Sequence, residues 1–316
     1  MAEDDATWTV GRLVEWTRGF FEKKGINQPR LEAEILLAHV LGAERIDLYL
    51  GYARPVGDPQ RERLRDLVRR RAAREPARYL TGECEFMSLA FKVTPACLIP
   101  RPETELLVEE VVRRCGRRPT LFEPPALTGG TGKQGDVPAG SPGGLRAIDL
   151  CTGCGCVAVS LAAHLPAMRV LATDISAAAL DVARTNAQAH GVGDRIEFLE
   201  GDLYDALDAA GAEPADFLVA NPPYVAEAEW AGLEPEVRDY EPRGALVAGP
   251  EGTEMIARIL KGAPAYLRPG GTLLVEIGAS QGTAARELAG RVRGLADVEV
   301  RKDYANLDRM LVARKA

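Results

Sequence analysis

The sequence lacks the features of a membrane or secreted protein. It has no run of about 18 apolar residues, which argues against a membrane-spanning helix. It begins with "MAEDDATWTV", an acidic stretch without the basic and apolar regions of a secretory signal. We therefore expect a cytoplasmic protein whose six cysteines remain thiols. Cys84, Cys97 and Cys115 have no spacing that indicates pairing, and we interpret them as small buried hydrophobic residues.

The sequence also lacks an excess of positive charge. Lysine and arginine number 39 against 46 acidic residues, which gives a net charge of −7. Binding along a nucleic-acid backbone depends on clustered positive charge, so we expect no stable nucleic-acid binding, and we expect no membrane partner. With 46% hydrophobic residues over 316 positions, the chain can fill two cores. We therefore expect two domains, and we expect a monomer because nothing in the sequence requires more.

Residues 1–80 have helical periodicity and form the first expected domain. Apolar side chains recur at steps of three and four residues, and three helices are expected at "VGRLVEWTRGFFEKKG", "PRLEAEILLAHVLG" and "DPQRERLRDLVRRRAAREPARYLTG". The third stretch holds eight arginines between Arg61 and Arg78 against three acidic residues. Two interpretations remain open: a solvated helix face, or a docking face for an acidic or RNA-associated partner.

Two segments follow this helical region. Residues 81–102 are expected to form a hairpin around Met87 and Ser88 and then a linker. Residues 117–145 are rich in proline, glycine and threonine and contain little to bury, which predicts a flexible surface insert without chemistry. The second domain, residues 103–316, contains this insert.

From Arg146 onward, strand and helix patterns alternate, which is typical of an α/β protein with a parallel sheet. Strands are expected at "RAIDL", "RVLAT", "RIEFLE", "DFLVA" and "TLLVEIG". The tail "VEVRKDYANLDRMLVAR" offers two more strands in an antiparallel pair, so the sheet has seven strands and is mostly parallel. Ligands of such sheets bind at the carboxyl ends of the strands, where the strand order reverses.

Acidic residues stand at the ends of three expected strands. Asp149 precedes a turn in which Gly153 and Gly155 let the backbone approach a ligand. Asp174, 25 residues after Asp149, suits the hydroxyl groups of a ribose. Asp202 ends the next strand, where it would meet an adenine edge. Each residue alone is explained as a helix cap or turn residue, but their recurrence at successive strand ends predicts a cofactor site.

The fourth strand end carries Asn221, Pro222, Pro223 and Tyr224, which resemble the (Asn/Asp)-Pro-Pro-(Tyr/Phe) motif of S-adenosylmethionine-dependent methyltransferases acting on planar nitrogen. The prolines remove two N–H donors and leave carbonyl oxygens as acceptors. The two hydrogens of a carboxamide nitrogen would be held by the Asn221 side-chain oxygen and the Pro222 carbonyl. The nitrogen would then face the methyl group in line, at about 3 to 3.5 Å, with Tyr224 packed against the amide.

Three cysteines in the glycine turn, Cys151, Cys154 and Cys156, raise the alternative of a zinc or iron–sulfur site. A nearby fourth ligand is lacking, because His164 lies along the following helix, where a packing or surface role is expected. We therefore expect no metal and interpret the turn as part of a cofactor cleft. Whether its thiols make cofactor binding sensitive to oxidation is open.

Six segments together resemble the HemK/PrmC family of release-factor glutamine methyltransferases. They are "FKVTPACLIPRPETELLVEEV", "IDLCTGCGCVAVSLA", "LATDISAAALDVARTNA", "FLVANPPYV", "YEPRGALVAGPEG" and "LLVEIGASQG". The resemblance runs from Tyr79 to the end apart from the insert, and "IPRPETE" separates it from generic adenine methyltransferases. It implies a Rossmann-like class I methyltransferase fold with a small N-terminal substrate-docking domain. It also implies methylation of the glutamine amide in the Gly-Gly-Gln motif of bacterial peptide chain release factors, with S-adenosyl-L-methionine as methyl donor and S-adenosyl-L-homocysteine as product.

The resemblance also implies the site residues. Those that would hold the substrate amide are Asn221, Pro222, Pro223 and Tyr224. Those that would hold the cofactor are Asp149, Cys151, Thr152, Gly153, Cys154, Gly155, Asp174, Asp202, Leu203 and Asn221. Within the second set, the turn from Cys151 to Gly155 would hold the methionine portion, Asp174 the ribose, and Asp202 with Leu203 the adenine. Arg101 to Thr104 would border the site, with no role assigned to each.

The chain departs from the family pattern in the glycine turn and in the insert at 117–145. Cys151 replaces the usual glycine at the first position of the turn, and Cys154 replaces a usual serine or threonine. If the first position has a positive φ, Cys151 is strained there, and cofactor affinity is the property affected.

Two other functions remain open. An adenine amine presents the same planar nitrogen to "NPPY", so a nucleic-acid adenine methyltransferase fits the motif, although the sequence offers no target-recognition domain. The second is a non-enzymatic binding scaffold. Loss of Asn221 or Asp174 would have favoured it, and both residues are present.

Overall fold

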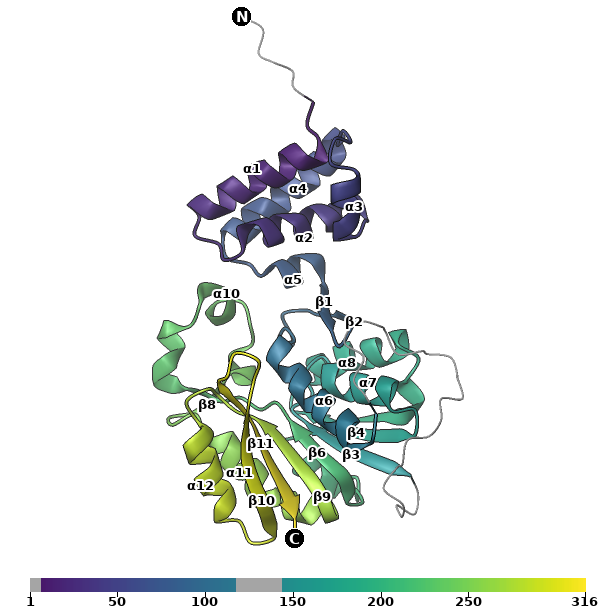
Figure 1. Cartoon of the computed structure of the whole chain (residues 1–316), viewed down its shortest axis with the longest axis vertical. Coiled ribbons are helices and arrows are strands. Elements are labelled where there is room, and N and C mark those ends of the chain that lie inside the picture. The colour runs from purple at the N-terminus through teal and green to yellow at the C-terminus, as the bar shows by residue number, and fades with distance from the viewer. Residues whose placement is uncertain (1–6, 118–143) are drawn as a thin grey trace, which may run out of the picture. The chain divides into compact units, whose positions relative to one another are not determined.

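The structure, a computed structural model, describes residues 7–117 and 144–316 (Figure 1). The predicted flexible insert at 117–145 therefore lies outside the described residues except at its two ends. Among the described helices, none is long and apolar enough to cross a membrane.

The chain forms two compact units. Unit 1 comprises the chain up to Glu83 together with Glu234–Tyr240, and unit 2 comprises Cys84–Leu233 and Glu241–Ala316. A segment from the second half of the sequence thus belongs to the N-terminal unit.

Unit 1 is helical, as the periodicity of the first 80 residues predicts. Thr9 caps the first helix, because its Oγ1 accepts a hydrogen bond from the Arg12 backbone N–H at 3.3 Å. Gly42 ends the second helix with a left-handed φ of 60°. The third expected helix is divided, because Arg74 has a φ of 77° and Pro76 follows it. The helices are α1 (Val10–Lys23), α2 (Pro29–Leu41), α3 (Arg45–Leu50), α4 (Asp58–Ala72), α5 (Ala77–Thr81) and, from the later segment, α10 (Pro235–Arg238).

The arginine-rich helix α4 holds the segment Glu234–Tyr240 in unit 1. Arg71 is buried, and its guanidinium contacts Glu32 at 2.7 Å and Glu236 at 3.0 Å. Arg74 contacts the same Glu236 oxygen at 3.1 Å. The interpretation of this stretch as a solvated face is therefore wrong for Arg71, which bridges two carboxylates inside the unit.

Unit 2 begins with a two-stranded hairpin, β1 (Glu83–Phe86) and β2 (Leu89–Lys92). Met87 and Ser88 form its turn with φ values of 50° and 58°, the positive values that a two-residue type I′ hairpin turn requires. The turn links two strands whose side chains alternate between buried and exposed positions.

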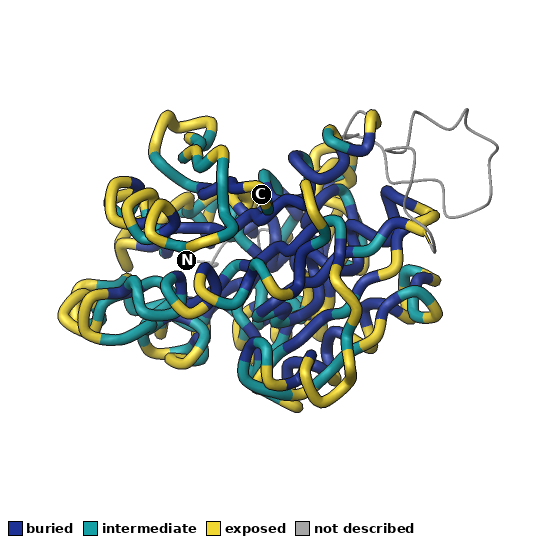
Figure 2. The backbone as a smooth tube through the Cα atoms, turned by 90° about the horizontal axis from the view of Figure 1, so that it is seen from below, coloured by how far each residue is buried: buried dark blue, intermediate teal, exposed yellow. Residues whose placement is uncertain are grey.

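The core of unit 2 is the predicted sheet of seven mostly parallel strands. Its order is β10-β11-β9-β6-β3-β4-β5, and β11 runs antiparallel to both of its neighbours. The central strands are buried along most of their length (Figure 2). The strands are β3 (Leu145–Leu150), β4 (Met168–Asp174), β5 (Ile196–Glu200), β6 (Ala215–Ala220), β9 (Leu267–Glu276), β10 (Leu295–Lys302) and β11 (Asp308–Lys315).

Helices cover this sheet, with α7 packed against both α6 and α8, and α11 packed against α12. Their bounds are α6 (Glu105–Arg114), α7 (Cys156–His164), α8 (Ala177–Ala189), α9 (Asp205–Ala209), α11 (Glu254–Tyr266) and α12 (Gly282–Gly290). The remaining elements are the strands β7 (Val225–Ala226) and β8 (Val247–Gly249) and the 3₁₀ turns η1 (Pro102–Thr104), η2 (Gly193–Arg195), η3 (Glu227–Gly232) and η4 (Arg243–Ala245).

The strand order reverses between β3 and β6, because the chain proceeds from β3 to β4 and β5 on one side and to β6 and β9 on the other. Leu150 at the end of β3 pairs with Ala220 at the end of β6. This register places Cys151 beside Asn221. A reversal of this kind is where doubly wound sheets bind ligands.

Substituting Arg71 tests its role in unit 1. Arg71→Ala should lower the free energy of unfolding by about 3 kcal/mol, because it leaves Glu32 without its arginine partner and Glu236 with Arg74 alone. Arg63→Ala, on the exposed part of the same helix, is the matched control and should change it by less than about 0.5 kcal/mol. The measurement is urea denaturation followed by circular dichroism. Equal denaturation midpoints for the two variants would contradict the assignment.

Candidate active site

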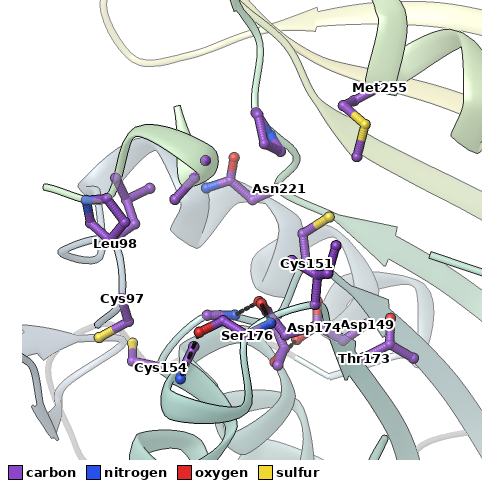
Figure 3. A pocket seen from close by; sticks show the side chains of 18 of the residues that line it. Cys97, Leu98, Asp149, Cys151, Cys154, Thr173, Asp174, Ser176, Asn221 and Met255 are labelled. Carbon is purple, nitrogen blue, oxygen red and sulfur yellow. Dashed lines mark hydrogen bonds between the residues drawn. The ribbon is translucent and has the colours of Figure 1, made fainter. Parts of the chain in front are cut away.

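A cavity of about 420 Å³ lies at the carboxyl ends of β3, β4, β5 and β6, entirely within unit 2 (Figure 3). This volume is within the range of about 300 to 1,000 Å³ that is typical of small-molecule sites. Of the residues predicted from the sequence, those that line it are Asp149, Cys151, Thr152, Gly153, Cys154, Asp174, Asp202, Leu203, Asn221 and Pro223. The cavity wall as described does not include Gly155, Pro222 or Tyr224.

The glycine turn between β3 and α7 has three residues with positive φ. Cys151 has a φ of 60°, Gly153 of 57° and Gly155 of 81°. A side chain at Gly155 would bring its Cβ within 2.9 Å of the Ala183 Cβ, so this position requires glycine for space as well as for conformation. Cys151, in contrast, bears a side chain at a φ that L-residues rarely adopt, which stores strain of about 1 to 3 kcal/mol.

Asp149 fixes the shape of this turn. It is 1% exposed, and its Oδ2 accepts hydrogen bonds from the Thr152 hydroxyl at 2.7 Å and from the Ala158 N–H at 3.2 Å. Burial raises the pKa of Asp149 to about 7, against the lowering effect of these two donors. Asp149 therefore ties the turn to the first turn of α7 and supports the cavity wall from a nearly inaccessible position.

Asp174 at the end of β4 holds the opposite side of the turn. Its Oδ2 accepts a hydrogen bond from the Gly153 N–H and its Oδ1 accepts one from the Ser176 N–H, both at 2.9 Å (Figure 3). A carboxylate has about four acceptor positions, so each oxygen retains a lone pair for a ligand. The neighbouring Thr173 belongs to the cavity wall, and its buried hydroxyl has no hydrogen-bond partner among the described residues. The Asp174 carboxylate is thus available to the hydroxyls of a bound molecule.

Asp202 and Leu203 follow β5 and form a third part of the wall. Asp202 forms an ion pair with the Arg258 guanidinium of α11 at 2.8 Å. Met255, one turn earlier on α11, lines the cavity near these residues. Arg258 and Met255 could not be predicted from the sequence, because α11 carries no glycine turn or strand-end carboxylate that marks them.

Asn221 is held by residues distant in the sequence. Its Nδ2 donates a hydrogen bond to the Thr104 Oγ1 at 3.0 Å, and the Thr104 hydroxyl donates to the Glu276 Oε2 at 2.6 Å. Among the described residues, none donates a hydrogen bond to Asn221 Oδ1. Because the amide nitrogen donates one of its hydrogens to Thr104, the carboxamide is oriented, and its oxygen remains as an acceptor for a ligand in the cavity.

Tyr224 is oriented by the same carboxylate. Its hydroxyl donates to the Glu276 Oε1 at 3.3 Å, and burial raises the pKa of Tyr224 well above its usual value. Its backbone is fixed as well, because its N–H donates to the Leu246 carbonyl at 3.1 Å and its carbonyl accepts from the Gln281 Nε2 at 2.8 Å. The position expected for Tyr224, against a substrate amide, remains a prediction.

Thr104 and Glu276 were given no role from the sequence, although both lie in segments quoted for the family resemblance. Thr104 belongs to "IPRPETE" and Glu276 to "LLVEIGASQG". Glu276 ends β9, the strand next to β6, so a carboxylate at the end of a buried strand was the signal that could have found it. Thr104 had no comparable signal. In the same segment, Arg101 forms an ion pair with the buried Glu241 at 2.6 Å.

The cysteines near the turn are thiols, of which Cys97, Cys154 and Cys156 are buried and Cys151 is partly exposed. Cys97 and Cys154 point their sulfurs toward each other at the edge of the cavity (Figure 3). Burial, with the nearby carboxylates, raises the pKa of Cys151 well above its usual value, so it is a neutral thiol at physiological pH. Within residues 7–117 and 144–316, no group of three or more histidine, cysteine or acidic residues has an arrangement that could hold a metal ion.

Two family models match the chain, one in each of its two units. Residues 12–82 match the family model described as the PrmC N-terminal domain, and residues 141–233 match the model described as the methyltransferase small domain. Among solved structures, the hMettl16 catalytic domain in complex with an RNA hairpin aligns with a TM-score of 0.52 and 19% identity, over 76% of this chain and 80% of that one. At this identity the likeness shows the fold alone.

Curated relatives match over nearly their whole length. The release factor glutamine methyltransferase of Chlorobaculum tepidum is 45% identical over 98% of both chains, and that of Rhodopirellula baltica is 40% identical over 100% of both. The predicted family resemblance is therefore confirmed, and the chain belongs to the family of release factor glutamine methyltransferases.

Proposed function

We propose that this enzyme methylates the side-chain amide nitrogen of the glutamine in the Gly-Gly-Gln motif of bacterial peptide chain release factors, with S-adenosylmethionine as methyl donor. The orientation of Asn221 is the observation that carries the proposal. Its amide nitrogen is bound by Thr104, so its oxygen is left to accept a hydrogen from a substrate nitrogen. It stands at the reversal of strand order, beside the glycine turn.

The wall of the cavity fits S-adenosylmethionine. The turn from Cys151 to Gly155 would hold the methionine portion, because its positive φ values bring backbone groups close to a ligand. Asp174 would accept hydrogen bonds from the ribose hydroxyls, because its carboxylate keeps acceptor capacity beyond the backbone N–H groups that it already binds. Asp202 and Leu203 would border the adenine. The bound molecule supplies an electrophilic methyl group on a positively charged sulfur.

The substrate amide would be held through its hydrogens. A carboxamide nitrogen is a weak nucleophile because its lone pair is delocalised, so its orientation decides the rate. Asn221 Oδ1 and the Pro222 carbonyl would each accept one N–H hydrogen, which turns the nitrogen toward the cavity. The same oxygens stabilise the positive charge that develops on the nitrogen, because both are hydrogen-bond acceptors fixed in place beforehand.

We assign release-factor docking to unit 1. Its helical residues match the PrmC N-terminal domain model, and it exposes apolar side chains that a protein partner would cover, with Trp16 52% and Leu50 82% exposed. We further propose that the enzyme works in the cytoplasm as a monomer and without a metal. Substrate docking then depends on unit 1, and chemistry depends on unit 2.

Methyl transfer to a purified bacterial release factor is the direct test. With labelled S-adenosylmethionine, the wild-type enzyme should label one glutamine, and a release factor with that glutamine replaced by alanine should take up no label. Asn221→Ala is the matched enzyme control, because loss of one positioned group typically lowers kcat about 100- to 1,000-fold. Transfer to DNA or RNA in place of the release factor would overturn the substrate assignment and favour an adenine methyltransferase.

Asp174→Ala should weaken cofactor binding while the sheet remains folded. A hydrogen bond to a charged group is worth about 1.5 to 3 kcal/mol, so the Kd for S-adenosylmethionine should rise about 10- to 100-fold. Isothermal titration calorimetry measures this change, and circular dichroism checks the fold. Asp181→Ala, on the exposed part of α8, is the control. Unchanged affinity in Asp174→Ala would remove this residue from the cofactor site.

Cys151→Gly should relieve the strain in the glycine turn. Glycine adopts a φ of 60° without a penalty, so the free energy of unfolding should increase by about 1 kcal/mol, and the Kd for S-adenosylmethionine should fall. Cys151→Ala keeps a Cβ and therefore the strain, which makes it the matched control. If the glycine and alanine variants have the same stability in urea denaturation, the strained conformation does not affect the folded state.

A further inference from the structure

The buried carboxylate of Glu276 lies at the centre of a hydrogen-bonded chain that ends at Asn221. We propose that Glu276, acting through Thr104, is a positioning residue that fixes and polarises the Asn221 carboxamide, and that rapid methyl transfer requires Glu276 to be ionised. This inference rests on the proposed function, because it concerns how the amide acceptor is prepared for its substrate.

The direction of the hydrogen bonds in this chain depends on the charge of Glu276. An ionised carboxylate only accepts hydrogen bonds, so the Thr104 hydroxyl must direct its hydrogen to Glu276 Oε2 at 2.6 Å. The Thr104 oxygen then presents a lone pair, which the Asn221 Nδ2 occupies at 3.0 Å. All three groups therefore have one consistent arrangement, with Asn221 Oδ1 left for the substrate.

Protonation of Glu276 removes this constraint. A protonated carboxyl can donate to the Thr104 oxygen, and the Thr104 hydroxyl is then free to donate to an acceptor. The Asn221 carboxamide can supply this acceptor if it turns by about 180°, so that its Oδ1 faces Thr104. The Asn221 NH₂ group would then face the substrate NH₂ group, and because both are donors, no hydrogen bond can form between them.

The charge also strengthens Asn221 as an acceptor. Hydrogen bonds to an ionised group are about twice as strong as neutral ones, and bonds in a chain polarise one another. Electron density is therefore shifted toward Asn221 Oδ1 when Glu276 is ionised. Because the substrate nitrogen becomes more positive during methyl transfer, this effect is larger in the transition state than in the bound substrate.

The surroundings of Glu276 bring its ionisation close to neutral pH. Burial is the largest effect and raises the pKa of Glu276 to about 7, and the negative charge of Glu103 on η1 raises it as well. The Thr104 and Tyr224 hydroxyls and the positive charge of Arg309 on β11 oppose this rise. The network is thus poised to change its state within the physiological range of pH.

The principal experiment is the single-turnover rate of transfer to a release factor between pH 5.5 and 8.5, with enzyme and cofactor saturating. The wild-type rate should rise about tenfold per pH unit below pH 7 and level off above it. Glu276→Gln should be about 100-fold slower at pH 8 and independent of pH. Asp149 also has a pKa raised to about 7, but it remains in this variant, so a flat profile assigns the titration to Glu276.

Thr104 variants distinguish positioning from packing. Thr104→Val keeps the shape but removes the hydroxyl, so it should be as slow as Glu276→Gln. Thr104→Ser restores the hydroxyl without the methyl group and should recover most of the lost rate. The KM for the release factor and the Kd for S-adenosylmethionine should change less than about threefold in all variants, because the effect is confined to the transition state.

Stability gives a readout that does not depend on turnover. The folded-state pKa of Glu276 is above its unfolded value of about 4.3, so its stabilising contribution is complete only below that pH and is lost as the pH rises to about 7. The urea midpoint of Glu276→Gln, relative to wild type, should therefore increase steadily from pH 5 to pH 7 and remain constant above it.

The outcomes separate the inference from the proposed function. A wild-type enzyme that labels no release-factor glutamine at any pH overturns the proposed function and the inference with it. A wild-type enzyme that labels the glutamine at a pH-independent rate overturns the inference alone. A Thr104→Val variant that is as fast as wild type also overturns the inference alone. This test holds even if Glu276→Gln fails to fold.

Discussion

The pairing of β3 with β6 is the constraint on which the site depends. Their parallel register sets Leu150 against Ala220, so the two residues that follow, Cys151 and Asn221, leave the sheet side by side. A shift of one strand by one residue would turn its side chains to the other face of the sheet and separate Cys151 from Asn221. Hydrophobic burial of the two strands therefore determines that the glycine turn and Asn221 meet at one edge of the sheet.

Carboxylates near the strand ends convert this register into a defined cavity. Asp149 is the last residue but one of β3, and Asp174 and Glu276 end β4 and β9. Each accepts hydrogen bonds from a segment that the sheet alone would not fix. Burial raises the pKa of all three, which means that their charge is unfavourable for folding near neutral pH. These charges therefore lower the free energy of unfolding, but they place fixed hydrogen-bond acceptors at the carboxyl edge of the sheet, beside the cavity.

The sequence predicted the parts of the site that depend on local chain properties. Alternating strands and helices gave the seven-stranded sheet, and strand-end residues such as Asp174 and Asn221 were found because glycine turns and "NPPY" mark them. The Thr104 hydroxyl contacts Asn221, which lies 117 residues away in the sequence, and Glu276, which lies 172 residues away, and no periodicity encodes such a meeting. Likewise, the arginine-rich pattern could not show that Arg71 is buried, because its partner Glu236 lies 165 residues away.

The segment Glu234–Tyr240 makes the two units covalently interdependent. The chain passes between them three times, after Glu83, after Leu233 and after Tyr240, so one cut cannot detach the helical unit. A fragment that begins at Cys84 would carry Glu236 without the arginines that neutralise it. The helical unit therefore cannot be replaced independently of this segment. A different recognition domain would need its own residues to bind the loop that follows "NPPY".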